Sequence, residues 1–255
     1  MSMIVDSHVH VGRWKYPPVE EYLAERGEVA AAVLVQFVGN ADNAYLARCV
    51  ADHPGVLSAV AMVEPETYGA TRHVERLAAT GRFSGVRLWA ATRSPGKDPL
   101  ALWRAIDRAG MVASVRGPLS DVASPEFAAI LDELPGLRVR LEHLGFTTYP
   151  DVDHKDFDRF LALAARPTAH TMWAGFYANS GRPYPHRDAD PYLRETLQAY
   201  GSRRITWSGD WNRPDRAPGD YAAAVRHVLD RPYLTEEDHA WILGGTARAL
   251  FTVTA

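Results

Sequence analysis

Cysteine is almost absent from this sequence, since Cys49 is the only one among 255 residues. A single cysteine cannot form an intrachain disulfide, and it excludes metal sites built from two or four cysteines. The chain can therefore fold in a reducing compartment. Cys49 falls on the apolar face of a predicted helix, where we expect it to be part of the core.

Long apolar runs and an excess of charge of one sign are also missing. No stretch approaches the roughly 18 uninterrupted apolar residues of a membrane-spanning helix, and the segment Met1–Asp6 lacks the basic start of a signal peptide. The formal net charge is only −3, from 28 basic and 31 acidic residues. Such a balance does not predict a chain-wide attraction to nucleic acid or anionic lipid. We therefore expect a cytoplasmic protein whose partner is a small-molecule substrate.

What the sequence does contain is a regular alternation of short apolar, β-branched runs with longer segments of helical period. The predicted strands are Met3–His10, Val29–Phe37, Val56–Val63, Ser84–Trp89, Met111–Arg116, Leu137–His143, Thr168–Ala174 and Arg204–Gly209. The predicted helices are Ala41–Asp52, Thr71–Thr80, Pro99–Ala109, Ser124–Leu134, Asp153–Ala165, Pro191–Tyr200, Gly219–Leu229 and Thr235–Phe251.

Eight such units predict an α/β protein with a parallel sheet closed into a single (β/α)8 TIM barrel, one domain over residues 1–255. No linker rich in Gly, Ser or Pro divides the chain. A doubly wound open sheet is the structural alternative. That fold typically carries a glycine-rich phosphate turn after its first strand, whereas this sequence has His8-Val9-His10 there. Barrels often self-associate, so a homo-oligomer stays open.

Polar side chains are expected at the carboxyl ends of the strands, where barrels place their active sites. Alternation along the first strand puts Asp6, His8 and His10 on one face, and we expect this face to point into the barrel. Two imidazoles there can coordinate one cation or hydrogen-bond one substrate oxygen. Since burying them without a role is unfavourable, a function is favoured over a structural histidine pair.

Two later strands end in residues suited to the same chemistry. Asp210 follows the last strand, beside the first strand of a closed barrel, and a carboxylate there suits a general base or a metal ligand. The alternative role of Asp210 is structural, as a helix N-cap or part of a turn. His143 ends the sixth strand, with Gly145 allowing close backbone approach. Glu142 is expected to point the opposite way and to act as a structural partner.

Several motifs together resemble the amidohydrolase superfamily, in particular the amidohydrolase-related (amidohydrolase 2) branch with lactonases of sugar acids and dicarboxylated pyrones and some nonoxidative decarboxylases. They run from the first strand to the last helix: Asp6-Ser7-His8-Val9-His10, Gly85-Val86-Arg87-Leu88, Glu142-His143-Leu144-Gly145, Ser208-Gly209-Asp210-Trp211 and Leu243-Gly244-Gly245-Thr246-Ala247-Arg248-Ala249-Leu250-Phe251. The resemblance implies a TIM-barrel hydrolase, with the metal-dependent hydrolases among its relatives.

The sequence departs from the metal-dependent pattern, which adds a carboxylated lysine or glutamate on strand four and a histidine on strand five. Here strand four offers Arg87, and strand five offers Ser114 and Arg116. A zinc or manganese ion would rest on His8, His10 and Asp210, with or without His143, and three protein ligands with a water form a plausible catalytic shell. Cationic side chains on both strands repel a divalent ion. We therefore favour an enzyme that does not require a metal.

Further residues are candidates for binding the substrate. Guanidinium groups hold carboxylates with two parallel hydrogen bonds, so arginines at strand ends suit an acidic substrate, with salt bridging as the alternative. The loop after the seventh strand is long, aromatic and basic, and such loops shape barrel pockets. The predicted substrate-binding residues are Arg87, Arg93, Arg116, Trp89, Trp173, Tyr177 and His186.

These residues predict hydrolysis of a lactone of a small acidic or sugar-acid substrate. His8, His10 and His143 would polarise the carbonyl, and Asp210 would activate water. A lactone is a reactive acyl group, so a site without metal can suffice. The alternatives are a metal-dependent decarboxylase of an aromatic or unsaturated acid and a non-catalytic barrel that binds a small acid.

Overall fold

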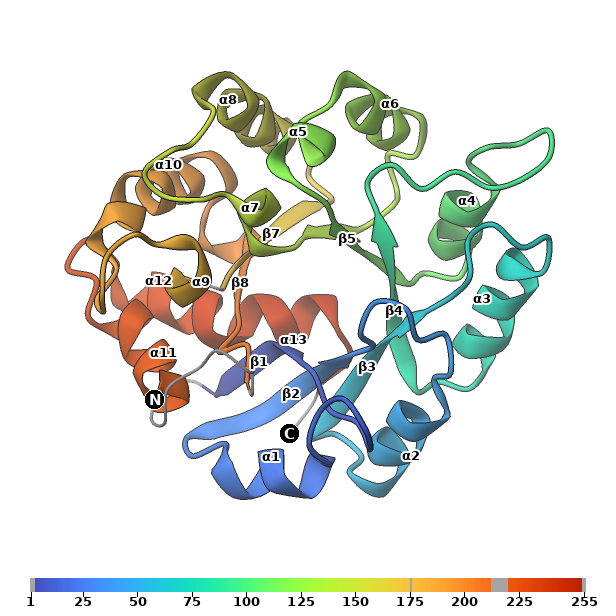
Figure 1. Ribbon diagram of the computed structural model, residues 1–255, viewed down its shortest axis with the longest axis horizontal. Helices are drawn as coiled ribbons and strands as arrows, with labels where there is room; N and C mark the ends of the chain where they lie inside the picture. The colour runs from blue at the N-terminus through green and yellow to red at the C-terminus, as the bar shows by residue number, and fades with distance from the viewer. Residues whose placement is uncertain (1–2, 175, 212–219, 254–255) are drawn as a thin grey trace.

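Eight parallel strands follow one another in chain order around a central ring, and helices surround them (Figure 1). The computed structural model describes residues 3–174, 176–211 and 220–253. The strands are β1 Ile4–Val9, β2 Val29–Val35, β3 Leu57–Met62, β4 Phe83–Trp89, β5 Val112–Arg116, β6 Val139–Leu141, β7 Ala169–Trp173 and β8 Ile205–Trp207. This arrangement confirms the predicted (β/α)8 barrel, whereas its treatment as one domain stays a prediction.

The helices follow the strands in the expected alternation. They are α1 Val19–Glu25, α2 Ala44–Asp52, α3 Ala70–Ala79, α4 Ala101–Arg108, α5 Leu119–Val122, α6 Pro125–Glu133, α7 His143–Phe146, α8 His154–Ala162, α9 Phe176–Asn179, α10 Asp190–Tyr200, α11 Asp220–Leu229, α12 Glu236–Ala240 and α13 Thr246–Leu250, with short 3-10 turns at Leu163–Ala165, Arg187–Ala189 and Ser202–Arg204. The short helices α1, α5, α7 and α9 were not predicted, because none is long enough to show a helical period. No helix among the described residues is long and apolar enough to cross a membrane.

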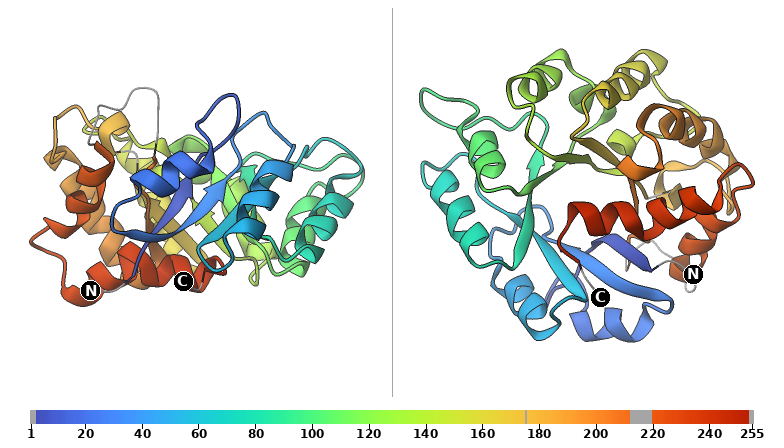
Figure 2. Two further views of the ribbon diagram at one scale, coloured as in Figure 1. Left: turned by 90° about the horizontal axis from the view of Figure 1, so that it is seen from below. Right: turned by 180° about the vertical axis from the view of Figure 1, so that it is seen from behind.

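The last helical segment closes one end of the barrel. The predicted helix Thr235–Phe251 is found as α12, a π-helical stretch Trp241–Gly245 and α13, and it runs across the amino-terminal ends of the strands (Figure 2). A Cβ atom on Gly244 would clash with the carbonyl oxygen of Met3, so only glycine permits this approach. Leu250 and Phe251 pack with Val5 and other valines of the barrel interior. With this end filled by apolar side chains, the opposite end is left for a site.

The two ends of the sheet, β8 and β1, are joined through Asp6. No backbone ladder links these strands among the described residues, but the Asp6 carboxylate accepts hydrogen bonds from Ser208 Oγ at 2.7 Å and from the Gly209 amide at 3.1 Å. The carboxylate also accepts from the His8 amide at 3.0 Å and from the hydroxyl of Tyr221 on α11, outside the barrel, at 3.0 Å. The expectation that Asp6 points inward is therefore wrong. The pairing of β1 with β2 is irregular between Asp6 and Val9, and this shift breaks the alternation on which the expectation relied.

Candidate active site

A cavity of about 290 Å³ opens at the carboxyl ends of the strands. Residues that are far apart in the sequence line it: His10, Lys15, Tyr16, Phe37, Val38, Arg87, Arg116, His143, Phe146 and Asp210. His8 is fully buried in direct contact with this set. The structure thus brings the four predicted catalytic residues His8, His10, His143 and Asp210 to one place.

His8 and His10 lie side by side at the end of β1. The Nε2 atoms of the two rings are 3.2 Å apart, and Nδ1 of His10 is 2.7 Å from the carbonyl oxygen of Val35 on β2. Burial lowers the pKa of His8 well below its usual value and lowers that of His10 to about 4. Both imidazoles are therefore neutral at pH 7.

His143 reaches the cavity through a left-handed turn that directly follows β6. The φ angles of His143, Leu144 and Phe146 are 51°, 51° and 52°, a conformation that disfavours side chains by about 1–2 kcal/mol per residue. Gly145 belongs to the same turn, and a Cβ there would lie 2.8 Å from the Val122 side chain of α5. Such strain is concentrated at functional sites. The turn places the His143 ring 5.2 Å from that of His8, and its Nδ1 atom is buried without a hydrogen-bond partner in the described structure.

Asp210 follows β8 and also has a positive φ, at 50°. Its backbone amide donates a 2.9 Å hydrogen bond to Ser208 Oγ, which in turn donates to Asp6. The Asp6 carboxylate, which joins β8 to β1, thus also positions the backbone of Asp210 through Ser208. Aspartate tolerates the left-handed region better than most residues, which fits its presence here.

A network of buried charges lies beneath the histidines. Arg87 donates to both carboxylate oxygens of Glu142, with its Nη2 at 2.7 Å from Oε2. Ser114 Oγ donates to the same carboxylate, and the Arg140 guanidinium lies 3.6 Å from it. Burial alone would raise the pKa of Glu142, but the charges of Arg87 and Arg140 lower it to about 2. Glu142 is therefore an ionised structural partner.

The expected direction of Glu142 is wrong, because its carboxylate lies inside the barrel, 3.9 Å from Nδ1 of His8. Strand β6 ends at Leu141, so the simple alternation that was assumed to separate Glu142 from His143 stops before either residue. The left-handed turn then directs His143 toward the same interior. Alternation predicts side-chain directions only within a strand.

The three predicted arginines have different surroundings. Arg87 lines the cavity but is engaged by Glu142 and by the carbonyl oxygen of Gln36.

Arg116 lies between two aromatic rings, 4.1 Å from the centre of Trp89 and 5.2 Å from that of Phe146. Its Nε atom is buried without a hydrogen-bond partner in the described structure. Arg93 is exposed and donates to backbone carbonyls nearby, away from the cavity. Arg116 is thus the arginine best placed to receive a substrate anion.

Two of the three candidates from the seventh loop, Trp173 and His186, do not line the cavity. Trp173 is fully buried in the apolar core. Nδ1 of His186 donates to the backbone carbonyl oxygen of Arg182, and its ring lies beside that of His227, away from the catalytic residues. The side chain of Tyr177 lies outside the described residues. The position of these residues on a long loop did not reveal which way each would point.

Five cavity residues were not predicted from the sequence: Lys15, Tyr16, Phe37, Val38 and Phe146. Lys15 and Tyr16 follow the histidine pair of β1, and the Tyr16 ring lies 5.1 Å from that of His10. The ammonium group of Lys15 lies over the Phe37 ring at 5.2 Å. Lys15 and Tyr16 could have been predicted from their position just after the histidine motif, because the loops that follow barrel strands line the active site.

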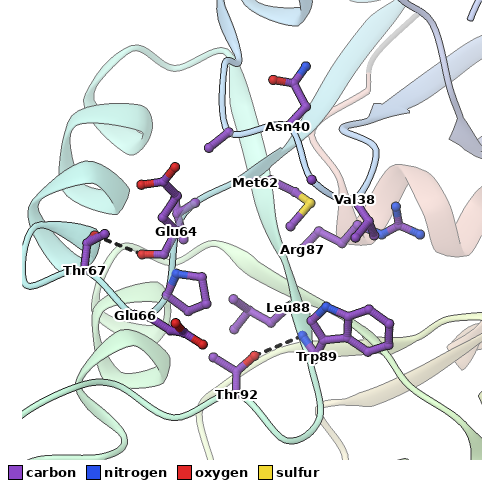
Figure 3. A pocket seen from close by; sticks show the side chains of 14 residues that line it. Val38, Asn40, Met62, Glu64, Glu66, Thr67, Arg87, Leu88, Trp89 and Thr92 are labelled. Atoms are coloured by element: carbon purple, nitrogen blue, oxygen red, sulfur yellow. Dashed lines mark hydrogen bonds between the residues drawn. The ribbon is translucent and has the colours of Figure 1, made fainter. Parts of the chain in front are cut away.

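A second cleft of about 490 Å³ adjoins the cavity and shares Val38 and Arg87 with it (Figure 3). Arg87 and Trp89 lie on one side, and Glu64 and Glu66 lie on the other. Trp89 was predicted to contact the substrate, and it stands here between the cleft and Arg116. The cleft gives a ligand in the cavity room to extend.

Three of the site residues could hold a metal ion. His8, His143 and Asp210 each offer one ligand atom, and these atoms lie within 4.8 Å of one another. Two imidazoles and one carboxylate are ligands that zinc accepts, with water in the fourth position. His10, which was predicted as a ligand, is not part of this group.

Comparison with known proteins places this geometry in a family. A family model described as amidohydrolase matches residues 5–253. An L-fucono-1,5-lactonase from Burkholderia ambifaria is 25% identical over 243 residues, which cover 90% of this chain and 82% of the lactonase. A structure from Pseudomonas putida with the provisional name 2-pyrone-4,6-dicarboxylic acid hydrolase is 23% identical, has a TM-score of 0.81, and is matched over 100% of this chain and 99% of its own. An amidohydrolase from Burkholderia multivorans with bound zinc is 18% identical, with a TM-score of 0.78 over 99% of this chain and 100% of its own.

Proposed function

This chain belongs to the amidohydrolase family of hydrolases, and we propose that it opens the ester bond of a small acidic lactone. The observation that carries the proposal is the convergence of His10, His143 and Asp210 on one cavity, with His8 directly behind them. The likeness to an L-fucono-1,5-lactonase and to a structure provisionally named as a pyrone dicarboxylic acid hydrolase supports a lactone as the substrate class.

Asp210 is the general base of the proposed reaction. Its carboxylate takes a proton from a water molecule as the water oxygen attacks the lactone carbonyl. The tetrahedral intermediate then collapses, the bond between the acyl carbon and the ring oxygen breaks, and Asp210 returns the proton to that oxygen. The product is an open-chain hydroxy acid. Imidazole N–H groups facing the cavity, from His143 above all, stabilise the oxyanion because they act in a site with little water.

Arg116 holds a carboxylate of the substrate. Its guanidinium is stacked on Trp89 and Phe146, which fixes its plane, and its buried Nε lacks a partner in the described structure. Burial and the charge of Arg87 lower its pKa, yet a guanidinium stays protonated at neutral pH. Arg116 forms no salt bridge among the described residues, and a preorganised cation of this kind favours an anionic ligand. Lys15 adds a second positive charge to the lining.

No metal is required in this proposal, since the positive charges of Arg87, Arg116 and Arg140 surround the histidines. The alternative is one zinc or manganese ion on His8, His143 and Asp210. When bound, such an ion would act as a Lewis acid that polarises the carbonyl.

A panel of sugar-acid lactones and carboxylated pyrones, assayed with metal-analysed protein, tests the proposal. Asp210→Asn keeps the left-handed backbone and should lower kcat by about 10²- to 10⁴-fold, the usual contribution of a general base. The matched control Asp132→Asn removes an exposed carboxylate that pairs with Arg166, and its activity should be unchanged. Full activity of Asp210→Asn would remove the proposed base, and release of carbon dioxide instead of ring opening would favour the decarboxylase.

A further inference from the structure

A chain of hydrogen bonds runs from Arg140 to His8 and on to His10. Nη2 of Arg140 lies 3.1 Å from Nδ1 of His8. A guanidinium can only donate, so Nδ1 of His8 has to accept with its lone pair. Because a neutral imidazole carries one proton, that proton is on Nε2 of His8.

The hydrogen bonds of His10 agree with this assignment. Nε2 of His8, now a donor, lies 3.2 Å from Nε2 of His10, which therefore accepts. The proton of His10 is then on Nδ1, where the carbonyl oxygen of Val35 accepts it at 2.7 Å. A doubly protonated ring does not offer another solution, because Nδ1 of His8 faces the donor group of Arg140 and cannot carry a proton of its own.

Arg140 is held in place from several sides, so it cannot turn away from His8. Its Nη1 donates to the carbonyl oxygen of Ser7 at 2.5 Å, and its Nη2 also donates to Ser114 Oγ at 2.6 Å. Its guanidinium stacks on the Phe251 ring at 4.9 Å. The side chain is fully buried, and moving its charge away from Glu142 would be unfavourable.

We propose that Arg140 is a positioning residue that holds His8 as an Nε2–H donor and thereby keeps divalent metals from binding to its ring. A metal ligand needs a free lone pair on nitrogen. In His8 the Nδ1 lone pair faces a cation, and Nε2 carries the proton. The cluster of His8, His143 and Asp210 therefore has the right ligand types at the right separation, but one of its three members is in the wrong protonation form.

This assignment also gives the three histidines different roles. Both nitrogens of His8 and both nitrogens of His10 are engaged in the chain, whereas His143 keeps a buried Nδ1 without a partner in the described structure. His143 is thus the imidazole available to donate to a developing oxyanion. This last step rests on the proposed lactone hydrolysis, but the tautomer of His8 does not.

Nitrogen-15 NMR of the histidine rings in the native protein tests the assignment directly, with His8→Gln and His10→Gln spectra to identify the signals. The two ring nitrogens of a neutral imidazole differ clearly according to which one carries hydrogen. We expect a protonated Nε2 for His8 and a protonated Nδ1 for His10. A protonated Nδ1 in His8 would overturn the proposal, whether or not the protein hydrolyses any lactone.

Zinc titration of Arg140→Met tests the consequence. In this variant Nδ1 of His8 can carry the proton and donate to the Glu142 carboxylate, 3.9 Å away, which is the arrangement found in many zinc sites. Zinc affinity should rise by about 10- to 100-fold, the range over which second-shell groups tune it. Arg138→Met, which removes a half-buried arginine just before β6, is the matched control and should leave zinc affinity unchanged.

Two results would contradict the proposal: tight stoichiometric zinc binding at this site by the unmodified protein, or unchanged zinc affinity in folded Arg140→Met. If Arg140→Met does not fold, the tautomers measured in the unmodified protein still decide the question. Absence of lactone hydrolysis alone would refute the proposed function and leave the tautomer assignment standing.

Discussion

Replacing Glu142 by glutamine should destabilise the fold through the two guanidinium groups it leaves behind. The Glu142 carboxylate accepts from Arg87 Nη2 at 2.7 Å and from Ser114 Oγ at 2.7 Å, and it lies 3.6 Å from Arg140. All three charged side chains are buried. Breaking a buried ion pair by removing one partner destabilises by roughly 3–5 kcal/mol, because the remaining charge is uncompensated.

The pKa of Glu142 gives a second, independent estimate of how much its ion pairs stabilise the folded protein. Its fall from 4.5 to about 2 in the folded protein corresponds to about 3 kcal/mol, at roughly 1.4 kcal/mol for each tenfold change in the ionisation constant. Because the folded pKa is depressed, this stability is present above pH 4.5 and is lost as the pH falls toward 2. It should decrease by about 2 kcal/mol between pH 5 and pH 3.

Chemical denaturation of the unmodified protein and of Glu142→Gln, from pH 7 to pH 3, measures this effect. Every titrating group except Glu142 is common to the two proteins, so its contribution cancels in the difference between their free energies of unfolding. This difference should be largest near neutral pH and should become smaller below pH 5. Glu133→Gln removes a carboxylate that pairs with Arg104 at the surface, and we expect no pH-dependent difference for this control. A small or pH-independent effect of Glu142→Gln would refute the reasoning.

Further predictions concern the cavity and its neighbour. Arg116→Gln should raise KM for carboxylated lactones by roughly 10-fold or more, the loss of one charged hydrogen bond, with little effect on neutral lactones; an equal effect on both would contradict its role. Met62→Trp should narrow the second cleft and reduce kcat/KM only for lactones with long substituents. Activity should persist as the pH is lowered to 5, because burial lowers the pKa of His10 to about 4, and a loss centred near pH 6.5 would contradict a neutral histidine pair. Gly145→Ala should destabilise the protein in thermal unfolding, since its Cβ would meet Val122 and its φ is 69°.

The strands and most helices could be predicted because their signal is local. Each run such as Val29–Val35 is apolar and β-branched, and the period of the long helices is visible within ten residues. The sequence also indicated His8, His10, His143 and Asp210, because a barrel collects residues at its strand ends whatever their separation along the chain. The strand ends that were predicted one to two residues too long reflect the gradual loss of pairing at the rim.

Side-chain directions at the strand ends could not be predicted in the same way. Asp6 and Glu142 were both assigned by alternation, but the register of β1 shifts directly after Asp6, and β6 ends before Glu142. The left-handed backbone at His143 and at Asp210 has no signature in these residues themselves; Gly145 is the only local hint. These conformations are stabilised by contacts with α5 and with the seam between β8 and β1, which only the folded chain brings together.

The buried charges connect the fold to the chemistry. Arg87, Arg140 and Glu142 occupy the barrel interior between its apolar floor and the histidines. Burial lowers the pKa of His8, and the net positive charge of two guanidinium groups around one carboxylate lowers it further and disfavours a divalent cation. The same charge favours an anionic substrate and an oxyanion. The same buried network thus supports both the proposed preference for an acidic lactone and the proposed independence from metal, and both should weaken in Arg140→Met.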